Sequence, residues 1–321
     1  MKKTLGLLLI IGLAAGASQS LRAYVTAKSR SAAGAIVAHK WDGSSFPIIW
    51  QMNPVQGANV TGSRTQAAVM NSAFQSWQSV VPVSLQQGTD TASTAKANQY
   101  DRVNLITTNT GPTDLPPGVY AYTYTFYFDD GGPGLVDPLG RPVLFPGQIL
   151  EADMAFNSSF PFTTSTTVPS NQADLQSIAT HEAGHFLGMD HASNASSTMF
   201  WSTVPGYSYQ RNLTTDDIAG ISTLYPPASF ASQGTLNGTV RTTSNAPVYG
   251  AIVVAVNANG VPVASSVTDP SGAYSIQGLA PGSYTVYAEP LSGRIGPTNI
   301  GTLSEIYKGS TVNSNFTTRY H

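Results

Sequence analysis

The spacing of apolar residues predicts a mixture of strands and helices in the first two thirds of the chain. Residues 65–80 place apolar side chains three or four positions apart, which is the period of one helix face. Pro82 then ends this helix, because proline has no N–H to donate to the helical ladder. Three runs have the composition or the two-residue alternation of strands: 46–52, 103–106 and 119–128. The pattern predicts an α+β domain.

The pattern changes after residue 233. Short runs rich in β-branched and aromatic residues are separated there by turns of glycine, proline and aspartate. The clearest runs are 234–240, 250–256, 268–274 and 278–286, and we expect one more strand at 305–307. Short strands at this spacing predict a small all-β sandwich.

A second helix is predicted shortly before residue 181. It should begin near Asn171, with Asp174 three residues later in a relation that resembles a capping box. Leu175, Ile178 and Ala179 would form its buried stripe. The helix then carries its polar residues on another face.

The spacing of five residues between positions 181 and 191 is suited to a metal site. His181 and His185 lie one helical turn apart, so both imidazoles can reach one metal ion. Glu182 lies beside such an ion, where a base can take a proton from water. Gly188 can adopt a positive φ and end the helix, which returns His191 as a third ligand. Three protein ligands leave one position open, as in catalytic zinc sites.

The alternative for this segment is a polar helix turn with two solvated histidines. The three-letter core of the motif does occur by chance. However, the chain has only five histidines, and three of them fall within these eleven residues together with the glycine. The metal site is therefore the favoured interpretation.

Residues 181–191 resemble the H-E-x-x-H-x-x-G-x-x-H signature of the metzincin zinc peptidases. Met199 follows His191 by eight residues (199 − 191 = 8), which resembles the methionine turn of the matrixin, or matrix-metalloproteinase-like, branch. Other segments similar to that branch are 73–77, 151–157 and 213–225. The resemblance covers residues 45–227 and implies a twisted mixed sheet with an active-site helix.

The same resemblance implies the roles of individual residues. One catalytic zinc ion would be held by His181, His185 and His191, with Glu182 as general base for zinc-activated water. Met199 would pack below the ligands as a soft apolar floor. The substrate would be an extended protein segment.

The resemblance also implies a substrate cleft along residues 119–128. Tyr122 would lie on a sheet edge to which a peptide can pair. Alternatively, Tyr120, Tyr122 and Tyr124 could equally pack on a solvated face. Phe200 and Trp201 would line the pocket for the side chain after the scissile bond. Two aromatic residues there depart from the usual Met-Tyr-Pro of the family.

Composition and charge restrict the function further. Charged residues make up only 10% of the chain and the formal net charge is −2, which argues against nucleic acid as a partner. Residues 1–17 have a positive start, a short apolar run and small residues at the end, as in a bacterial-type secretory signal peptide. Ala23 marks a second candidate cleavage position. We expect a secreted, extracellular monomer without a transmembrane segment.

The chain contains no cysteine, which excludes disulfides and the propeptide cysteine that keeps animal matrixins latent. Latency would need another ligand, with His39 and Asp42 as candidates, although solvated side chains are the simpler interpretation for both. The second, histidine-bound zinc of animal matrixins cannot form in the same way, because no histidine lies between residues 39 and 181. Calcium could bind acids of the loop at 129–147, such as Asp129, Asp130 and Asp137, although solvated loop acids are the simpler interpretation.

The order of glycine, proline and tyrosine positions over residues 234–290 resembles the carboxypeptidase regulatory-like domain, which has a prealbumin-like fold. We expect it to act as a spacer or attachment module. The predicted organisation is a signal peptide (1–17), an N-terminal segment or short pro-region (18–44), the zinc peptidase domain (45–227), a linker (228–233) and the sandwich (234–321).

Three functions remain open at this stage. The first is a secreted zinc endopeptidase. The second is an exported adhesive or surface-binding protein with an inactive metzincin fold, and the third is a zinc hydrolase of non-peptide amides. Intact ligands and Glu182 argue against the second, because an inactive descendant has no need of that carboxylate. The proposed edge strand disfavours the third only mildly.

Overall fold

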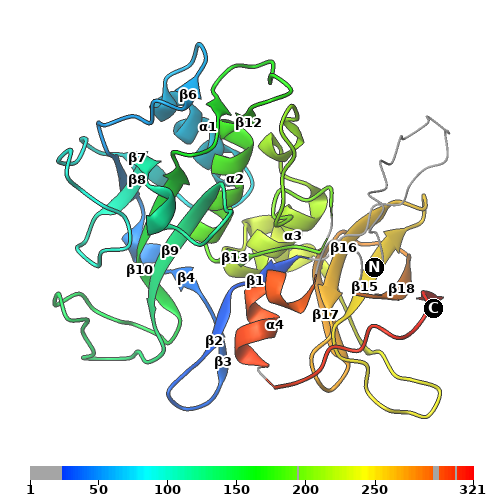
Figure 1. Ribbon diagram of the computed structural model, residues 1–321. Coiled ribbons are helices and arrows are strands. Elements are labelled where there is room, and N and C mark those ends of the chain that lie inside the picture. The colour runs from blue at the N-terminus through cyan, green and yellow to red at the C-terminus, as the bar shows by residue number, and fades with distance from the viewer. Residues whose placement is uncertain (1–23, 194, 292–295, 308) are drawn as a thin grey trace, which may run out of the picture.

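The computed structural model describes residues 24–193, 195–291, 296–307 and 309–321. Its first part is built on a twisted sheet whose longest strand is β10 (Gln148–Asn157) (Figure 1). Every residue of β10 is buried. The other strands are β4 (Lys40–Trp41), β5 (Ile48–Met52), β7 (Leu85–Gln87), β8 (Asn104–Thr110) and β9 (Ala121–Phe128).

Only β9 runs antiparallel in this sheet. It pairs along one side of β10, while β8 and β4 pair in parallel with the other side, and β5 and β7 continue the sheet beyond β8. Among the described strands β9 pairs with β10 alone, so it is an edge strand. The predicted strand at 119–128 therefore lies at a sheet edge.

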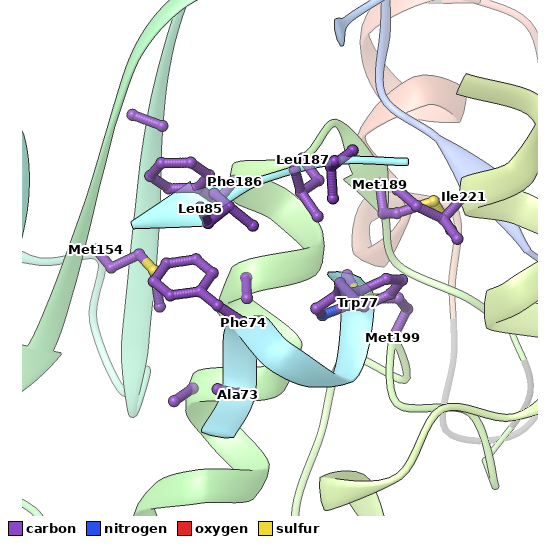
Figure 2. Close-up of a cluster of buried hydrophobic side chains, with 14 of the residues drawn as sticks. Ala73, Phe74, Trp77, Leu85, Met154, Phe186, Leu187, Met189, Met199 and Ile221 are labelled. Atoms are coloured by element: carbon purple, nitrogen blue, oxygen red, sulfur yellow. The ribbon is translucent and has the colours of Figure 1, made fainter. Parts of the chain in front are cut away.

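Three described helices belong to the first part of the chain: α1 (Gln66–Gln78), α2 (Leu175–Phe186) and α3 (Thr215–Leu224). Thr65 caps α1 by accepting from the N–H of Ala68, as expected for a helix that begins here. Phe74 and Trp77 project from α1 toward α2 and are almost fully buried (Figure 2). The indole N–H of Trp77 also donates to the carbonyl of Thr180, 2.8 Å away. The two helices are thus fixed against each other by packing and by one buried hydrogen bond.

Short pairings tie the remaining segments to this domain. β1 (Val25–Thr26) pairs with β13 (Met189–Asp190), and β2 (Lys28–Arg30) forms a hairpin with β3 (Ile36–Ala38). A small parallel sheet joins β6 (Val60–Thr61), β11 (Phe162–Thr163) and β12 (Ala173–Asp174). Short 3₁₀ turns are η1 (Gly43–Ser45), η2 (Pro112–Asp114), η3 (Tyr209–Arg211) and η4 (Ala228–Ser232).

The C-terminal part is the expected β-rich domain, and the α+β class with a following sandwich is confirmed. β14 (Gly234–Thr239) pairs with β17 (Ala273–Leu279). A second sheet has the order β16 (Pro262–Val267), β15 (Ala251–Asn257), β18 (Tyr284–Pro290) and β19 (Arg319–Tyr320).

Three local predictions in this domain were wrong. Residues 268–272 form the turn before β17, where Gly272 adopts φ +78°, and residues 280–283 form the turn before β18. The strand expected at 305–307 is instead the end of a short helix, α4 (Gly301–Ile306), which follows the turn η5 (Pro297–Asn299). Leu303 and Ile306 are buried three residues apart, a helical spacing that a three-residue window cannot distinguish from a strand.

The two parts share one hydrophobic core. Val253, Ala255 and Ile276 of the sandwich belong to the same buried cluster as the side chains of α1 and α2. Polar contacts cross the same boundary: Ser265 donates to Asp216 of α3 at 3.0 Å. The sandwich is therefore packed on the first domain.

The predicted signal peptide at residues 1–17 lies outside the described residues. Within the described part of the chain, none of the helices has the length and apolar character needed to cross a membrane.

Candidate metal centre and cleft

Helix α2 begins later than the sequence suggests. Asp174 is extended (φ −76°, ψ 111°) and is the N-cap, and its carboxylate accepts from the N–H of Ser177 at 2.9 Å. The same carboxylate forms a two-pronged ion pair with Arg211, with distances of 2.6 and 2.7 Å. The predicted start near Asn171 was therefore wrong, because Asp174 stabilises the chain at the helix entrance rather than inside the first turn.

The end of α2 follows the expected geometry. The helix ends at Phe186, and Gly188 adopts φ +94°. A Cβ atom at this position would lie 2.1 Å from the carbonyl oxygen of His39. Only glycine allows this close approach together with the left-handed conformation, and the chain then turns through β13 to bring His191 back toward the helix.

The structure brings His181, His185 and His191 together. Their ring centroids are 4.8, 5.1 and 4.7 Å apart, and one ring nitrogen from each lies within 4.8 Å of the others. The Nε2 atoms of His181 and His185 are 3.1 Å apart. Two imidazoles one helical turn apart and a third from the following segment therefore face a common point.

Each of the three rings has its Nδ1 atom bound to a backbone carbonyl. His181 pairs with Thr198 at 2.8 Å, His185 with Met189 at 2.9 Å and His191 with Asn299 at 2.6 Å. A carbonyl oxygen can only accept, so each Nδ1 carries the proton. Each Nε2 of the neutral ring then presents a lone pair toward the common point.

Burial lowers the pKa of all three imidazoles below 6.5, and mutual repulsion lowers those of His181 and His185 further. Three neutral rings that direct lone pairs at one another repel unless a cation lies between them. A set of three imidazole nitrogens suits zinc. The residues present therefore fit a metal ion of this kind.

Glu182 lies next to this cluster and is 5% exposed. Burial raises the pKa of its carboxyl, while the neighbouring His185 and a hydrogen bond from Thr123 oppose that rise. The hydroxyl of Thr123, on the edge strand β9, donates to Oε2 of Glu182 at 2.6 Å. A buried, oriented carboxyl beside three convergent histidines is suited to proton transfer.

Met199 is fully buried, and its sulfur lies beside Gly184 of α2. Its turn is held by Asp217 of α3, whose carboxylate accepts from the N–H groups of Thr198 (3.0 Å) and Met199 (3.2 Å). Asp217 also forms a capping box with Thr214 at the start of α3. One side chain thus joins α3 to the turn that carries Met199.

A cleft of about 730 Å³ opens above the histidines. Its lining includes Tyr122, Phe200 and Trp201, the three residues expected in a substrate pocket. Tyr122 and Trp201 are 41% and 40% exposed, whereas Phe200 is buried. At the Phe128 end of β9, His39 stacks on Tyr127 with 3.6 Å between the ring centroids, and both line the cleft.

The acidic loop that follows β9 is held by an arginine. Arg141 contacts Asp137 at 2.7 Å and the carboxylate of Glu151 at 3.8 Å. Burial alone would raise the pKa of Asp137, but hydrogen bonds from Tyr100 and Arg141 keep it below its usual value. Asp137 is 3% exposed and engaged in an ion pair, so the interpretation of Asp137 as a solvated loop acid was wrong. Calcium on Asp129 or Asp130 remains the alternative to solvated acids.

Sequence reasoning missed three contributors to this site: Thr123, Asp217 and Asn299. Thr123 could have been found from the alternation of β9, because it faces the side opposite to Tyr122 and Tyr124. Asp217 had a local signal as the third residue after a Thr cap. Asn299 contributes a backbone carbonyl, which no residue type encodes.

Comparison with known proteins supports both resemblances. Residues 139–226 match the matrixin family model, and residues 235–303 match the model of the carboxypeptidase regulatory-like domain. The assignments of these two segments are confirmed.

Several characterised proteins are similar to this chain. Metalloendoproteinase 1-MMP of Arabidopsis thaliana is 32% identical over 165 residues, which is 50% of this chain and 37% of that protein. Human matrix metalloproteinase-20 is 27% identical over 165 residues, or 48% and 26% of the two chains. Rat matrilysin is 32% identical over 123 residues, or 38% and 44%. The matched stretch thus spans less than half the length of each relative.

Proposed function

Because the chain carries a matrixin domain followed by a carboxypeptidase regulatory-like domain, we infer that it is a zinc-dependent endopeptidase. The observation that carries the proposal is the convergence of three imidazole lone pairs beside a buried carboxyl at the base of a cleft. Relatives named as metalloendoproteinase and matrix metalloproteinase support it.

In this proposal His181, His185 and His191 hold one zinc ion through Nε2. When bound, zinc supplies Lewis-acid polarisation of the scissile carbonyl and lowers the pKa of water. The backbone carbonyls on the three Nδ1 atoms keep each ring in the tautomer that a metal requires. Gly188 and Met199 support this arrangement from the turn and from below.

Glu182 is the general base in this mechanism. Because Thr123 holds Oε2, we assign proton transfer to Oε1. Burial raises the pKa of the carboxyl toward the operating range of a base that must also return its proton. Glu182 takes a proton from the attacking water and then donates it to the nitrogen of the leaving amine.

The substrate we propose is an extended protein segment. The edge of β9 that faces away from β10 lies along the cleft, and such a sheet edge can add a peptide as a further strand. Tyr122, Phe200 and Trp201 would contact side chains of that peptide. An extracellular location, with residues 1–17 as a signal peptide, completes the proposal.

The test is hydrolysis of casein by the full-length protein. We expect a chelator to stop it and added zinc to restore it. Glu182→Ala should retain one equivalent of zinc and lose about 10²–10⁴-fold in rate, because it removes only the general base. Thr203→Ser, a conservative change in the lining of the same cleft, is the matched control and should remain active.

Full casein hydrolysis by Glu182→Ala would remove the mechanism. Zinc binding by the wild type without hydrolysis of any protein would instead favour the exported adhesive protein with an inactive site.

A further inference from the structure

The third histidine of the metal centre is held by the C-terminal part of the chain. The partners of His181 and His185, Thr198 and Met189, lie 17 and 4 residues away in the sequence. The partner of His191 is the carbonyl of Asn299, 108 residues away in η5, at 2.6 Å. One of the three supporting hydrogen bonds therefore comes from outside the matrixin segment.

A second hydrogen bond links the same two segments, which meet at a junction between residues 190–191 and 298–301. Asp190 accepts from the backbone N–H of His191 at 2.7 Å and from the N–H of Gly301 at 3.2 Å, both through Oδ1. A single carboxylate oxygen thus ties the third histidine to the first residue of α4. Thr298, Asn299 and Gly301 also line the cleft.

The segment that carries Asn299 is anchored in the C-terminal domain. Ile300 is fully buried, in a cluster with Tyr249 and Leu303 and with Phe200 beside the metal centre. The hydroxyl of Tyr249 donates to the carbonyl of Leu303 at 3.1 Å. Figure 1 shows α4 beside β2, between the two parts of the molecule. The position of the Asn299 carbonyl therefore depends on the sandwich, while α4 also contacts β2 of the first part.

We propose that the C-terminal domain completes the metal centre, with residues 298–301 positioning His191. The hydrogen bond to the Asn299 carbonyl fixes the tautomer and orientation of the ring and raises the basicity of its Nε2. The domain is then part of the catalytic unit rather than a spacer. This inference deepens the proposed function and rests on it for the identity of the metal.

The test is the zinc dissociation constant of the full-length protein, measured by competition with a chelating dye. Gly301→Pro removes the N–H that binds Asp190. Gly301 is the first residue of α4, where proline is tolerated, and Ile300 has the extended conformation that precedes proline (φ −116°, ψ 103°). Gly301→Ala keeps the N–H, and its Cβ would lie 3.5 Å from Asp190, an ordinary contact.

A second pair of variants changes the turn itself. The side chain of Asn299 accepts from the N–H of Gly296 at 2.8 Å. Asn299→Ala loses this bond, whereas Asn299→Asp keeps the acceptor. Ile276→Ala is a destabilising control, because Ile276 is buried in the core that the sandwich shares with the first domain and is not part of the cluster around Ile300.

We expect Gly301→Pro and Asn299→Ala to raise the zinc dissociation constant about tenfold or more. Gly301→Ala, Asn299→Asp and Ile276→Ala should stay within about twofold of the wild type, since the bonds at the junction remain. Unchanged zinc affinity in folded Gly301→Pro and Asn299→Ala would overturn the proposal, and so would equal weakening in Ile276→Ala.

These outcomes are distinct from those of the proposed function. A wild type that binds zinc more tightly than Gly301→Pro but cleaves no protein supports the positioning role and removes the endopeptidase. If the wild type cleaves casein and its zinc affinity equals that of Gly301→Pro, the endopeptidase is supported and the positioning role is removed.

Discussion

At the scale of the single residue, His39 is a buried imidazole that the proposed metal centre does not use. It is 6% exposed, it stacks on Tyr127, and its Nε2 has no hydrogen-bond partner among the described residues. Burial lowers its pKa to about 4, although Asp129 and Asp190 oppose the shift. The folded protein therefore holds His39 neutral at pH values where the unfolded chain binds a proton.

This difference predicts a pH dependence of stability. Between pH 6.5 and about 4 the unfolded state carries one more proton at residue 39, so the contribution of His39 is present above pH 6.5 and is lost as the pH falls. His39→Phe keeps an aromatic ring on Tyr127 and cannot titrate. We expect the free energy of unfolding of the wild type, relative to His39→Phe, to fall by about 2 kcal/mol between pH 7 and pH 5.

Urea unfolding at several pH values, with a chelator present throughout, measures this difference. Both proteins contain the other histidines, so their titration cancels in the comparison. A constant difference between the two proteins from pH 7 to pH 5 would contradict the prediction.

The sequence predicts the roles of some single residues in the site better than those of others. The spacing of His181 and His185 is a property of the helix itself, and Gly188 has a conformational requirement that few other residues satisfy. The carbonyl of Asn299 is the opposite case, because every residue has one. Its role depends on a contact across 108 residues, which only the folded chain reveals.

At the scale of the element, the packing of α2 depends on a glycine inside the helix. A Cβ atom at Gly184 would lie 2.2 Å from Sδ of Met199 and 2.8 Å from the ring of Trp77. Figure 2 shows Trp77 and Met199 next to each other. The helix gives up intrinsic propensity at this position so that α1 and the methionine turn can approach it.

Gly184→Ala should therefore destabilise the protein, although alanine is the better helix former. The propensity gain is about 1 kcal/mol, whereas overpacking of a core costs about 1–3 kcal/mol. We expect a net loss of up to about 2 kcal/mol in thermal unfolding. Gly282→Ala is the matched control: its Cβ would have no neighbour closer than 3.9 Å, so stability should stay constant. A stabilised Gly184→Ala would show that the contact is absent in solution.

Helices and strands with a long periodic pattern were predicted well, and their ends were not. The start of α2 depends on the ion pair of Asp174 with Arg211, 37 residues away. The helix α4 depends on burial of Ile300 and Leu303 against Tyr249. Both boundaries are decided by tertiary contacts, which override local propensity.

At the scale of the whole molecule, the two parts behave as one packed body. Tyr24, near the start of the described chain, accepts from the N–H of Gln277 in β17 at 3.1 Å. Ala219 of α3 lies 3.3 Å from the position of a Cβ on Gly278. Strand β17 thus lies against α3, the helix whose Asp217 holds the methionine turn.

Because the two parts share a core, we predict that a destabilising substitution in the sandwich also lowers the stability of the first domain. All four tryptophans, Trp41, Trp50, Trp77 and Trp201, precede the sandwich, so their fluorescence reports on the first domain alone. Ile276→Ala leaves a cavity in the sandwich and should cost about 2–5 kcal/mol. Since the two parts share their core, we expect the urea midpoint of the tryptophan signal to fall with that of the circular dichroism.

The measurement is made with a chelator present, because metal release would add its own contribution. Val261→Ala is the control, since Val261 lies in the sandwich but is 45% exposed and its truncation removes little burial. If the sandwich folded as an independent module, Ile276→Ala would leave the tryptophan midpoint unchanged and produce a separate early transition. Coincident shifts would instead explain how a domain attached after the peptidase region can hold the third histidine firmly enough to act on its metal.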